Sequence, residues 1–66
     1  MKVILNGEAY NTDALFINGL LDELKIASGR VAVEVNLRII KKTEFDSLKL
    51  CEGDSIEIVN FVGGGN

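Results

Sequence analysis

Apolar and polar residues alternate at the start of the chain with the period of two that is typical of a half-buried strand. This alternation runs from Met1 to Asn6. Asn6-Gly7 is the strongest short signal for a tight hairpin, because both central positions of such a turn need φ > 0. The sequence therefore predicts a second strand that runs back antiparallel through about Ala9 to Thr12.

The next stretch has the periodicity of an amphipathic helix. Its apolar residues recur with helical spacing at Ile17, Leu20, Leu21 and Leu24. This pattern predicts a helix of about three turns that ends near Ile26, with Gly29 as its terminator. Three polar residues ahead of the helix are candidate N-caps, namely Asn11, Thr12 and Asp13.

Alternation returns in the second half of the chain. It predicts a third strand from Val31 to Asn36, a short strand around residues 38–41, and a last strand that ends near Phe61. Residues 43–46 (Thr-Glu-Phe-Asp) resemble a capping box and predict a single helical turn. Because only one predicted helix is long enough to cover a sheet, the pattern indicates an α+β domain with one helix on one face of one sheet.

The alternation also divides the predicted sheet into two faces. The face toward the helix takes Val3, Leu5, Val33, Ile56 and Ile58. The open face takes the other apolar strand residues, interrupted by Glu34 and Glu57, and these are Ile4, Ala32, Val59 and Phe61. Since a contiguous exposed apolar patch typically marks an interaction site, we predict partner docking through Ile4, Val59, Phe61 and the adjoining Val62. The alternative is that strand twist buries Val59 and Phe61 at the sheet edge.

The length of the chain limits what such a fold does alone. A chain of 66 residues buries only about 60% of its unfolded surface, so it supports one small core. A deep substrate cavity would hollow that core out. The chain has no His, and its single Cys forms neither an internal disulfide nor a cysteine-rich zinc site. We therefore expect no enzyme activity, no bound metal or cofactor, and a function carried by the surface or a terminus.

Charge and hydropathy exclude two further kinds of partner. The net charge is −3, and Lys41-Lys42 is the only basic doublet, which opposes binding to nucleic acid. No apolar run approaches the roughly 20 residues of a membrane span, and no signal segment opens the chain. These features, with the lone thiol, predict a cytoplasmic protein whose partner presents a basic docking face.

The last residues of the chain suggest a specific chemistry. Val62 is followed by Gly63, Gly64, Gly65 and Asn66, and we expect a folded domain of residues 1–62 with a flexible tail of residues 63–66. A tail without side chains can thread a narrow channel and present its carboxylate to a catalytic site in another protein. If ATP activated that carboxylate as an acyl-adenylate, a sulfur or amine nucleophile would attack it, and the chain would be a covalent carrier. The alternative is an inert, frayed terminus.

Taken together, these motifs resemble the ThiS family, the small sulfur carrier proteins of thiamine (thiazole) biosynthesis. The resemblance covers the whole chain in order: Asn6-Gly7-Glu8, the helix segment 20–24, the strand 31–36, the turn 52–54, the strand 56–59 and the closing Gly63-Gly64-Gly65. It implies a ubiquitin-like β-grasp fold, with a mixed sheet of four or five strands, one main helix packed on one face and a short helical turn. It also implies a monomer when the protein is free.

The resemblance further implies a mechanism. In this family a ThiF-type activating enzyme uses ATP to adenylate the terminal glycine, and sulfur from a cysteine desulfurase converts it to a thiocarboxylate. The thiocarboxylate then delivers its sulfur to thiazole synthase. Carried over to this chain, Gly65 is the acyl carrier, Gly64 is its diglycine partner and Gly63 extends the arm.

This sequence departs from the family pattern at three places. Asn66 follows the diglycine, so adenylation at Gly65 requires its removal if it belongs to the native chain. Asn36-Leu37 stands where relatives often have Asn-Gly, and because Leu is strained at φ > 0 we expect another turn geometry there. The connection from hairpin to helix is also a residue short, which leaves the start of the helix open.

Three other interpretations remain. The small subunit of molybdopterin synthase is a sulfur carrier with the same fold and tail chemistry, although it is usually longer. A protein-binding module with an inert tail is a second. A redox or nucleophilic role for Cys51 is a third, disfavoured because no His activates it and because Cys is commonly buried.

Overall fold

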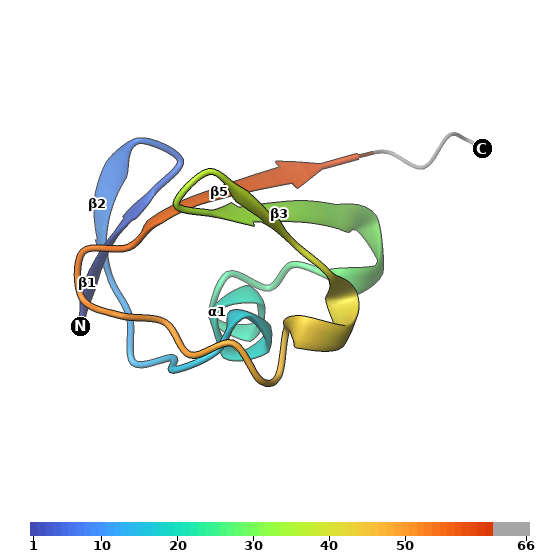
Figure 1. Cartoon of the computed structure of the whole chain (residues 1–66), viewed down its shortest axis with the longest axis horizontal. Helices are drawn as coiled ribbons and strands as arrows, with labels where there is room; N and C mark the ends of the chain where they lie inside the picture. The colour runs from blue at the N-terminus through green and yellow to red at the C-terminus, as the bar shows by residue number, and fades with distance from the viewer. Residues whose placement is uncertain (62–66) are drawn as a thin grey trace.

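The computed structural model describes residues 1–61, and within them a five-stranded sheet carries an α-helix on one face (Figure 1). The strands lie in the order β2-β1-β5-β3-β4. Their bounds are β1 (Lys2–Leu5), β2 (Glu8–Asn11), β3 (Val31–Val35), β4 (Arg38–Ile40) and β5 (Ser55–Asn60). β5 pairs in parallel with β1 and antiparallel with β3. This mixed sheet confirms the predicted α+β class and its single helix-covered sheet.

The first hairpin forms as predicted. Leu5 pairs with Glu8, and both turn residues between them have positive φ, 48° at Asn6 and 85° at Gly7. The side chain of Asn6 also accepts a hydrogen bond from the backbone N–H of Ile58 at 2.8 Å. The turn therefore fixes the end of β1 beside the middle of β5.

Helix α1 (Ile17–Glu23) is shorter than its apolar pattern predicts. Its end is a Schellman motif, in which the N–H of Lys25 bonds to the carbonyl of Asp22 (3.1 Å) and that of Ile26 to the carbonyl of Leu21 (2.9 Å). Lys25 takes the left-handed position, with φ at 60°. The prediction that Gly29 ends the helix is wrong, because Gly29 lies in the later 3-10 turn η1 (Ser28–Arg30).

The predicted N-caps of α1 are also wrong. The residue that precedes the helix is Phe16, which makes no side-chain cap hydrogen bond. Thr12 is buried instead, and its hydroxyl donates to Glu23 at 2.6 Å while accepting from the N–H of Ala14 at 2.9 Å. The polar groups of the loop between β2 and α1 therefore bind Glu23 at the end of the helix and do not cap the start of the helix.

The second hairpin contradicts the expectation for Asn36-Leu37. Both residues have positive φ, 52° and 69°, between the paired residues Val35 and Arg38. The pairing leaves a loop of two residues, and a type I′ turn, with positive φ at both positions, is one of the two turn types that match the twist of the strands. Strand pairing therefore decides the geometry against the steric preference of Leu, whose side chain is 91% exposed.

The core lies between the sheet and α1. Its members are apolar residues of β1, β3, β4 and β5 together with α1, Ala14, Phe45 and Leu50. Phe45 follows the short 3-10 turn η2 (Lys42–Glu44), which begins one residue before the predicted helical turn. Thr43 is not its cap. The carboxylate of Glu44 instead accepts a hydrogen bond from the N–H of Lys41 at 3.0 Å. Across residues 1–61, the structure has no helix with the length and apolar character needed to cross a membrane.

Candidate functional site

The candidate site begins where β5 leaves the sheet. β5 is held between β1 and β3, and the backbone continues its bonding to Phe61, whose N–H donates to the carbonyl of Arg30 at 2.9 Å. A central strand therefore carries the chain to the last described residue (Figure 1). Val62, Gly63, Gly64, Gly65 and Asn66 lie outside the described residues, so the docking, acyl-carrier and arm roles predicted for them stay predictions.

The open face of the sheet keeps the apolar residues that the alternation places there. Val59 is 59% exposed, Phe61 is 46% exposed and Ala32 is exposed, while Ile4 is half-buried. The alternative in which strand twist buries Val59 and Phe61 is wrong. The residues predicted to face the helix are buried, apart from Leu5, which is half-buried against the core. An apolar surface thus leads directly to the last described residue.

The sequence pattern missed one member of this face. Ile39 on β4 is 71% exposed and pairs with Glu34, so it lies on the same face as Ala32 and Val59. The missing signal was the register of β4, because residues 38–41 alternate too briefly to indicate which side faces the core. Once Ile40 is paired with the buried Val33, Ile39 must point outward.

A hollow lies on the open face over β3, β4 and β5. It has a volume of about 190 Å³, and Ile39, Val59 and Ala32 line it together with Glu34 and Glu57. The small side chain of Ala32 leaves room between its larger neighbours. This surface can hold one side chain of a partner protein but has no catalytic base or nucleophile beyond the two carboxylates.

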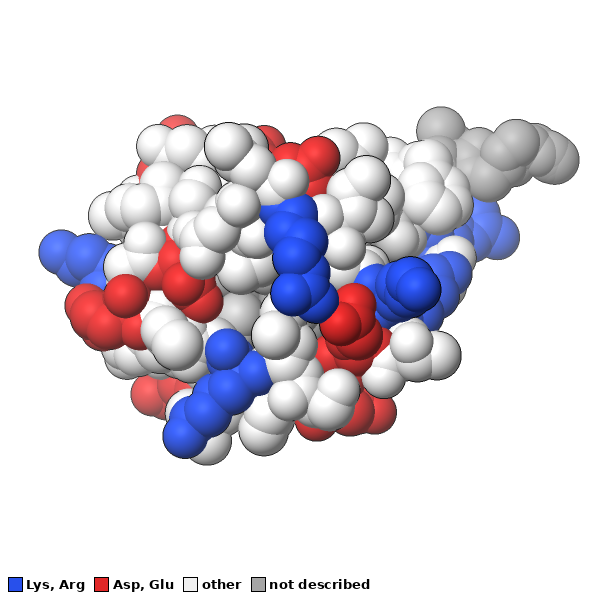
Figure 2. All heavy atoms as spheres, viewed as in Figure 1, with Lys and Arg blue, Asp and Glu red and all other residues white. Residues whose placement is uncertain are grey.

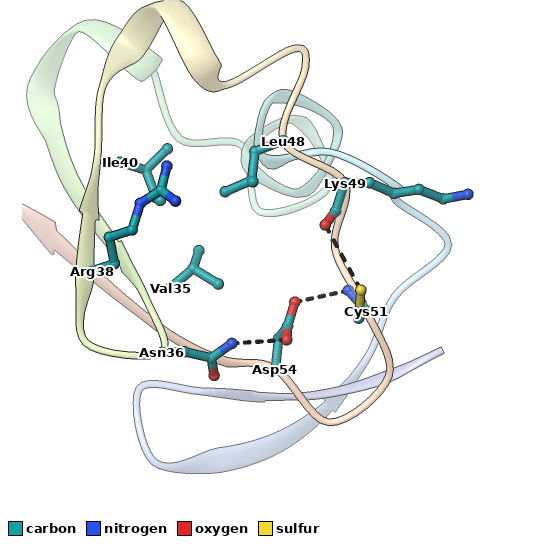
Figure 3. A pocket seen from close by; sticks show the side chains of 8 residues that line it. All are labelled: Val35, Asn36, Arg38, Ile40, Leu48, Lys49, Cys51 and Asp54. Atoms are coloured by element: carbon teal, nitrogen blue, oxygen red, sulfur yellow. Dashed lines mark hydrogen bonds between the residues drawn. The ribbon is translucent and has the colours of Figure 1, made fainter.

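A second hollow, of about 340 Å³, lies on the core-facing side of the second hairpin, between that hairpin and residues 48–54 (Figure 3). The Asp54 carboxylate lies in this hollow. It accepts hydrogen bonds from the N–H of Cys51 at 2.8 Å and from the side chain of Asn36 at 3.0 Å. The guanidinium of Arg38 forms a salt bridge with Glu44 at 2.7 Å, and Lys49 points away from the hollow. These bonds join the hairpin to the turn at residues 51–54. The expectation that Cys51 is buried is wrong, since it is exposed at the rim.

The strongest electrostatic cluster lies at the end of α1. Glu23 accepts hydrogen bonds from the Thr12 hydroxyl (2.6 Å), the N–H of Asp13 (3.0 Å) and the Tyr10 hydroxyl (3.3 Å). These donors, Thr12 first, hold the pKa of Glu23 below its usual value. Desolvation, followed by the charge of Glu23, raises the pKa of Tyr10. The cluster closes the loop between β2 and α1 and does not belong to the open face.

Charge is mixed over the surface seen in Figure 2, where acidic and basic side chains alternate and neither sign covers the view. The chain as a whole is acidic, with a net charge of −3. Recognition by charge must therefore rest on local groups rather than on a uniform field.

Comparisons with known proteins agree on one family. The ThiS family model matches residues 3–65. The sulfur carrier protein ThiS of Bacillus subtilis is 41% identical over 63 residues, covering 92% of this chain and 96% of that protein. The thiazole synthase of Paramagnetospirillum magneticum is 43% identical over 67 residues and that of Magnetococcus marinus 42% over 66. This chain spans 21% and 20% of the length of those two synthases.

A solved structure supports the same assignment. The crystal structure of the thiamine biosynthesis protein (ThiS) from Geobacter metallireducens matches with a TM-score of 0.83 at 33% identity, covering 98% of this chain and all of that one. This match confirms the ubiquitin-like β-grasp fold. With a family model and a solved relative both matched over nearly the whole chain, the chain belongs to the ThiS family.

Proposed function

We propose that this chain is a sulfur carrier for thiamine thiazole synthesis and that Gly65 carries the sulfur as a thiocarboxylate. The observation that carries the proposal is the family match, which runs from residue 3 to Gly65 and so includes the diglycine Gly64-Gly65. The chain acts as a substrate of other enzymes and is not itself a catalyst. It binds no cofactor, and the sulfur it carries is covalently attached.

The chemistry is that of an activated carboxylate. The carboxylate oxygen of Gly65 attacks the α-phosphorus of ATP in a ThiF-type adenylating enzyme, and pyrophosphate leaves. A cysteine desulfurase indirectly supplies sulfur as a persulfide, whose terminal sulfur attacks the acyl carbon and displaces AMP. A thiol reductant then cleaves the S–S bond of the resulting acyl disulfide and releases Gly65 as the thiocarboxylate. Gly64 and Gly63 let the carboxylate enter a narrow catalytic channel, because glycine has no side chain to obstruct it.

Thiazole synthase receives the sulfur. Support comes from the two relatives named thiazole synthase, in each of which a domain like this chain makes up about a fifth of the polypeptide. Sulfur transfer requires this domain to contact the synthase, and we propose that it does so through a docking surface. The ATP and the desulfurase that the cycle requires place it in the cytoplasm, where we expect the free chain to be a monomer.

We further propose that the open face is the docking surface. Ile4, Val59, Phe61 and Val62 are the residues through which it contacts the adenylating enzyme and the synthase. The exposure of Val59 and Phe61 on the strand that leads to the tail supports this role. Docking here positions the carboxylate because few residues separate Phe61 from Gly65.

The test is a mass measurement. The protein, trimmed to end at Gly65, is incubated with the adenylating enzyme, ATP and a sulfur donor. Its intact mass should rise by one oxygen-to-sulfur exchange, and the gain should lie in the C-terminal peptide. A variant that lacks Gly64 and Gly65 is the matched control and should show no gain. An unchanged mass with an enzyme that modifies Bacillus subtilis ThiS would refute the proposal. The untrimmed chain, run in parallel, shows whether Asn66 must first be removed.

A further inference from the structure

Two carboxylates face each other on the open face. Glu34 on β3 pairs directly with Glu57 on β5. Like charges directly opposite on neighbouring strands destabilise a sheet. In residues 1–61 the ion pair that the structure shows joins Arg38 and Glu44, so it does not relieve this repulsion. Residues 62–66 contain no Lys or Arg that could relieve it.

Apolar side chains frame this acidic pair. Ile39 is 71% exposed and lies next to Glu34 in the sheet, while Val59 is 59% exposed and lies next to Ala32. These residues and the two carboxylates line the hollow of about 190 Å³. A Lys or Arg side chain has the matching shape and chemistry, because its long aliphatic stem packs on apolar surface while its head bonds to carboxylates.

We propose that this hollow receives a basic side chain of thiazole synthase, with its stem between Ile39 and Val59 and its charged head between Glu34 and Glu57. The inference rests on the proposed function and adds the recognition chemistry of its docking surface. Charge complementarity selects a basic side chain over an apolar one, since an apolar occupant would leave two facing carboxylates desolvated. We choose thiazole synthase as the partner because two relatives named thiazole synthase contain a domain similar to this chain.

The experiment compares two double variants of the full chain that change the net charge equally. E34Q/E57Q removes the acidic pair of the hollow. D22N/E8Q removes two exposed carboxylates from α1 and β2, neither of which makes a side-chain hydrogen bond in the described part of the chain. Dissociation constants for purified thiazole synthase and for the adenylating enzyme are measured at low and high salt, and melting temperatures are recorded for every variant.

E34Q/E57Q should weaken binding to the synthase about ten-fold at low salt, as expected for removal of a charged partner from an interface. The difference should shrink at high salt, and D22N/E8Q should bind like the wild type. The melting temperature of E34Q/E57Q should equal or exceed that of the wild type, because a like-charge pair is removed. Weaker binding of E34Q/E57Q without a lower melting temperature would show that the acidic pair acts in recognition of the synthase and not in folding.

Two results overturn the inference while leaving the proposed function intact. One is E34Q/E57Q binding the synthase as tightly as D22N/E8Q does. The other is E34Q/E57Q losing affinity for the adenylating enzyme alone. A wild-type chain that does not bind the synthase at all would instead refute the docking step of the proposed function, and this inference with it.

Discussion

At the scale of single residues, Leu37 is the clearest conflict between local preference and fold. Its φ of 69° places it in the left-handed region, and its side chain is 91% exposed, so it has little packing to offset the strain. Leu37→Gly removes a strain of about 1–2 kcal/mol from the folded state. It also increases the entropy of the unfolded chain, which lowers the stability by up to about 1 kcal/mol. We expect a net gain that raises the melting temperature by about 2–6 °C.

The control for that change is Leu37→Ala. Alanine also lacks most of the exposed side chain but keeps the Cβ that causes the strain, so it should not stabilise the protein. Thermal unfolding followed by circular dichroism measures both variants. Equal melting temperatures for the two would show that positive φ costs nothing at this turn.

Protonation of Glu23 makes the stability of the protein depend on pH. Its pKa in the folded state lies below the unfolded value, chiefly because of the hydrogen bond from Thr12. The stabilisation is therefore fully present above the unfolded-state pKa and is lost as the pH falls through the lowered folded-state pKa. Glu23→Gln should lower the melting temperature by about 5 °C at neutral pH, and the difference from the wild type should shrink as the pH falls below the unfolded-state pKa of Glu23.

Glu8→Gln serves as the comparison for that experiment, because Glu8 is an exposed carboxylate with no side-chain hydrogen bond among residues 1–61. Its melting temperature should follow the wild type at both pH values. If Glu23→Gln and wild type differ by the same amount at neutral and acid pH, the ionised form of Glu23 is not what holds the loop.

At the scale of elements, the sequence predicted which segments form strands and helix better than where they end. The apolar spacing of α1 continues through Leu24 to Ile26, yet the helix ends at Glu23. Both residues still pack against the core. Periodicity reports which residues are buried, whereas the end of a helix depends on backbone bonds such as those made by Lys25 and Ile26.

The same distinction explains how much of the candidate site was predictable. Alternation placed Val59 and Phe61 on the open face, because β5 is long enough to show its period. It did not reveal Ile39, because β4 has three residues and its orientation follows from pairing with β3. The facing of Glu34 and Glu57 is likewise a matter of register between strands, which no local pattern contains.

At the scale of the whole molecule, the sheet provides both the proposed docking surface and β5, the strand that runs to Phe61 at the end of the described residues. Phe61→Ala should weaken binding to the adenylating enzyme about ten-fold, as truncation of a well-packed aromatic anchor does. Because Phe61 is 46% exposed, the domain should remain folded. The rate of adenylation at saturating carrier should change little, since the carboxylate that reacts is untouched.

Leu15→Ala separates this effect from a general loss of surface hydrophobicity. Leu15 is 52% exposed, but it lies in the loop before α1 rather than on the open face. Steady-state kinetics of adenylation should therefore show a raised KM for Phe61→Ala and an unchanged KM for Leu15→Ala. A fall in kcat with constant KM would mean that Phe61 positions the tail within the enzyme rather than docking the domain. Equal KM values for the two variants would remove the open face from the binding step, because exposed apolar area alone would then account for the affinity.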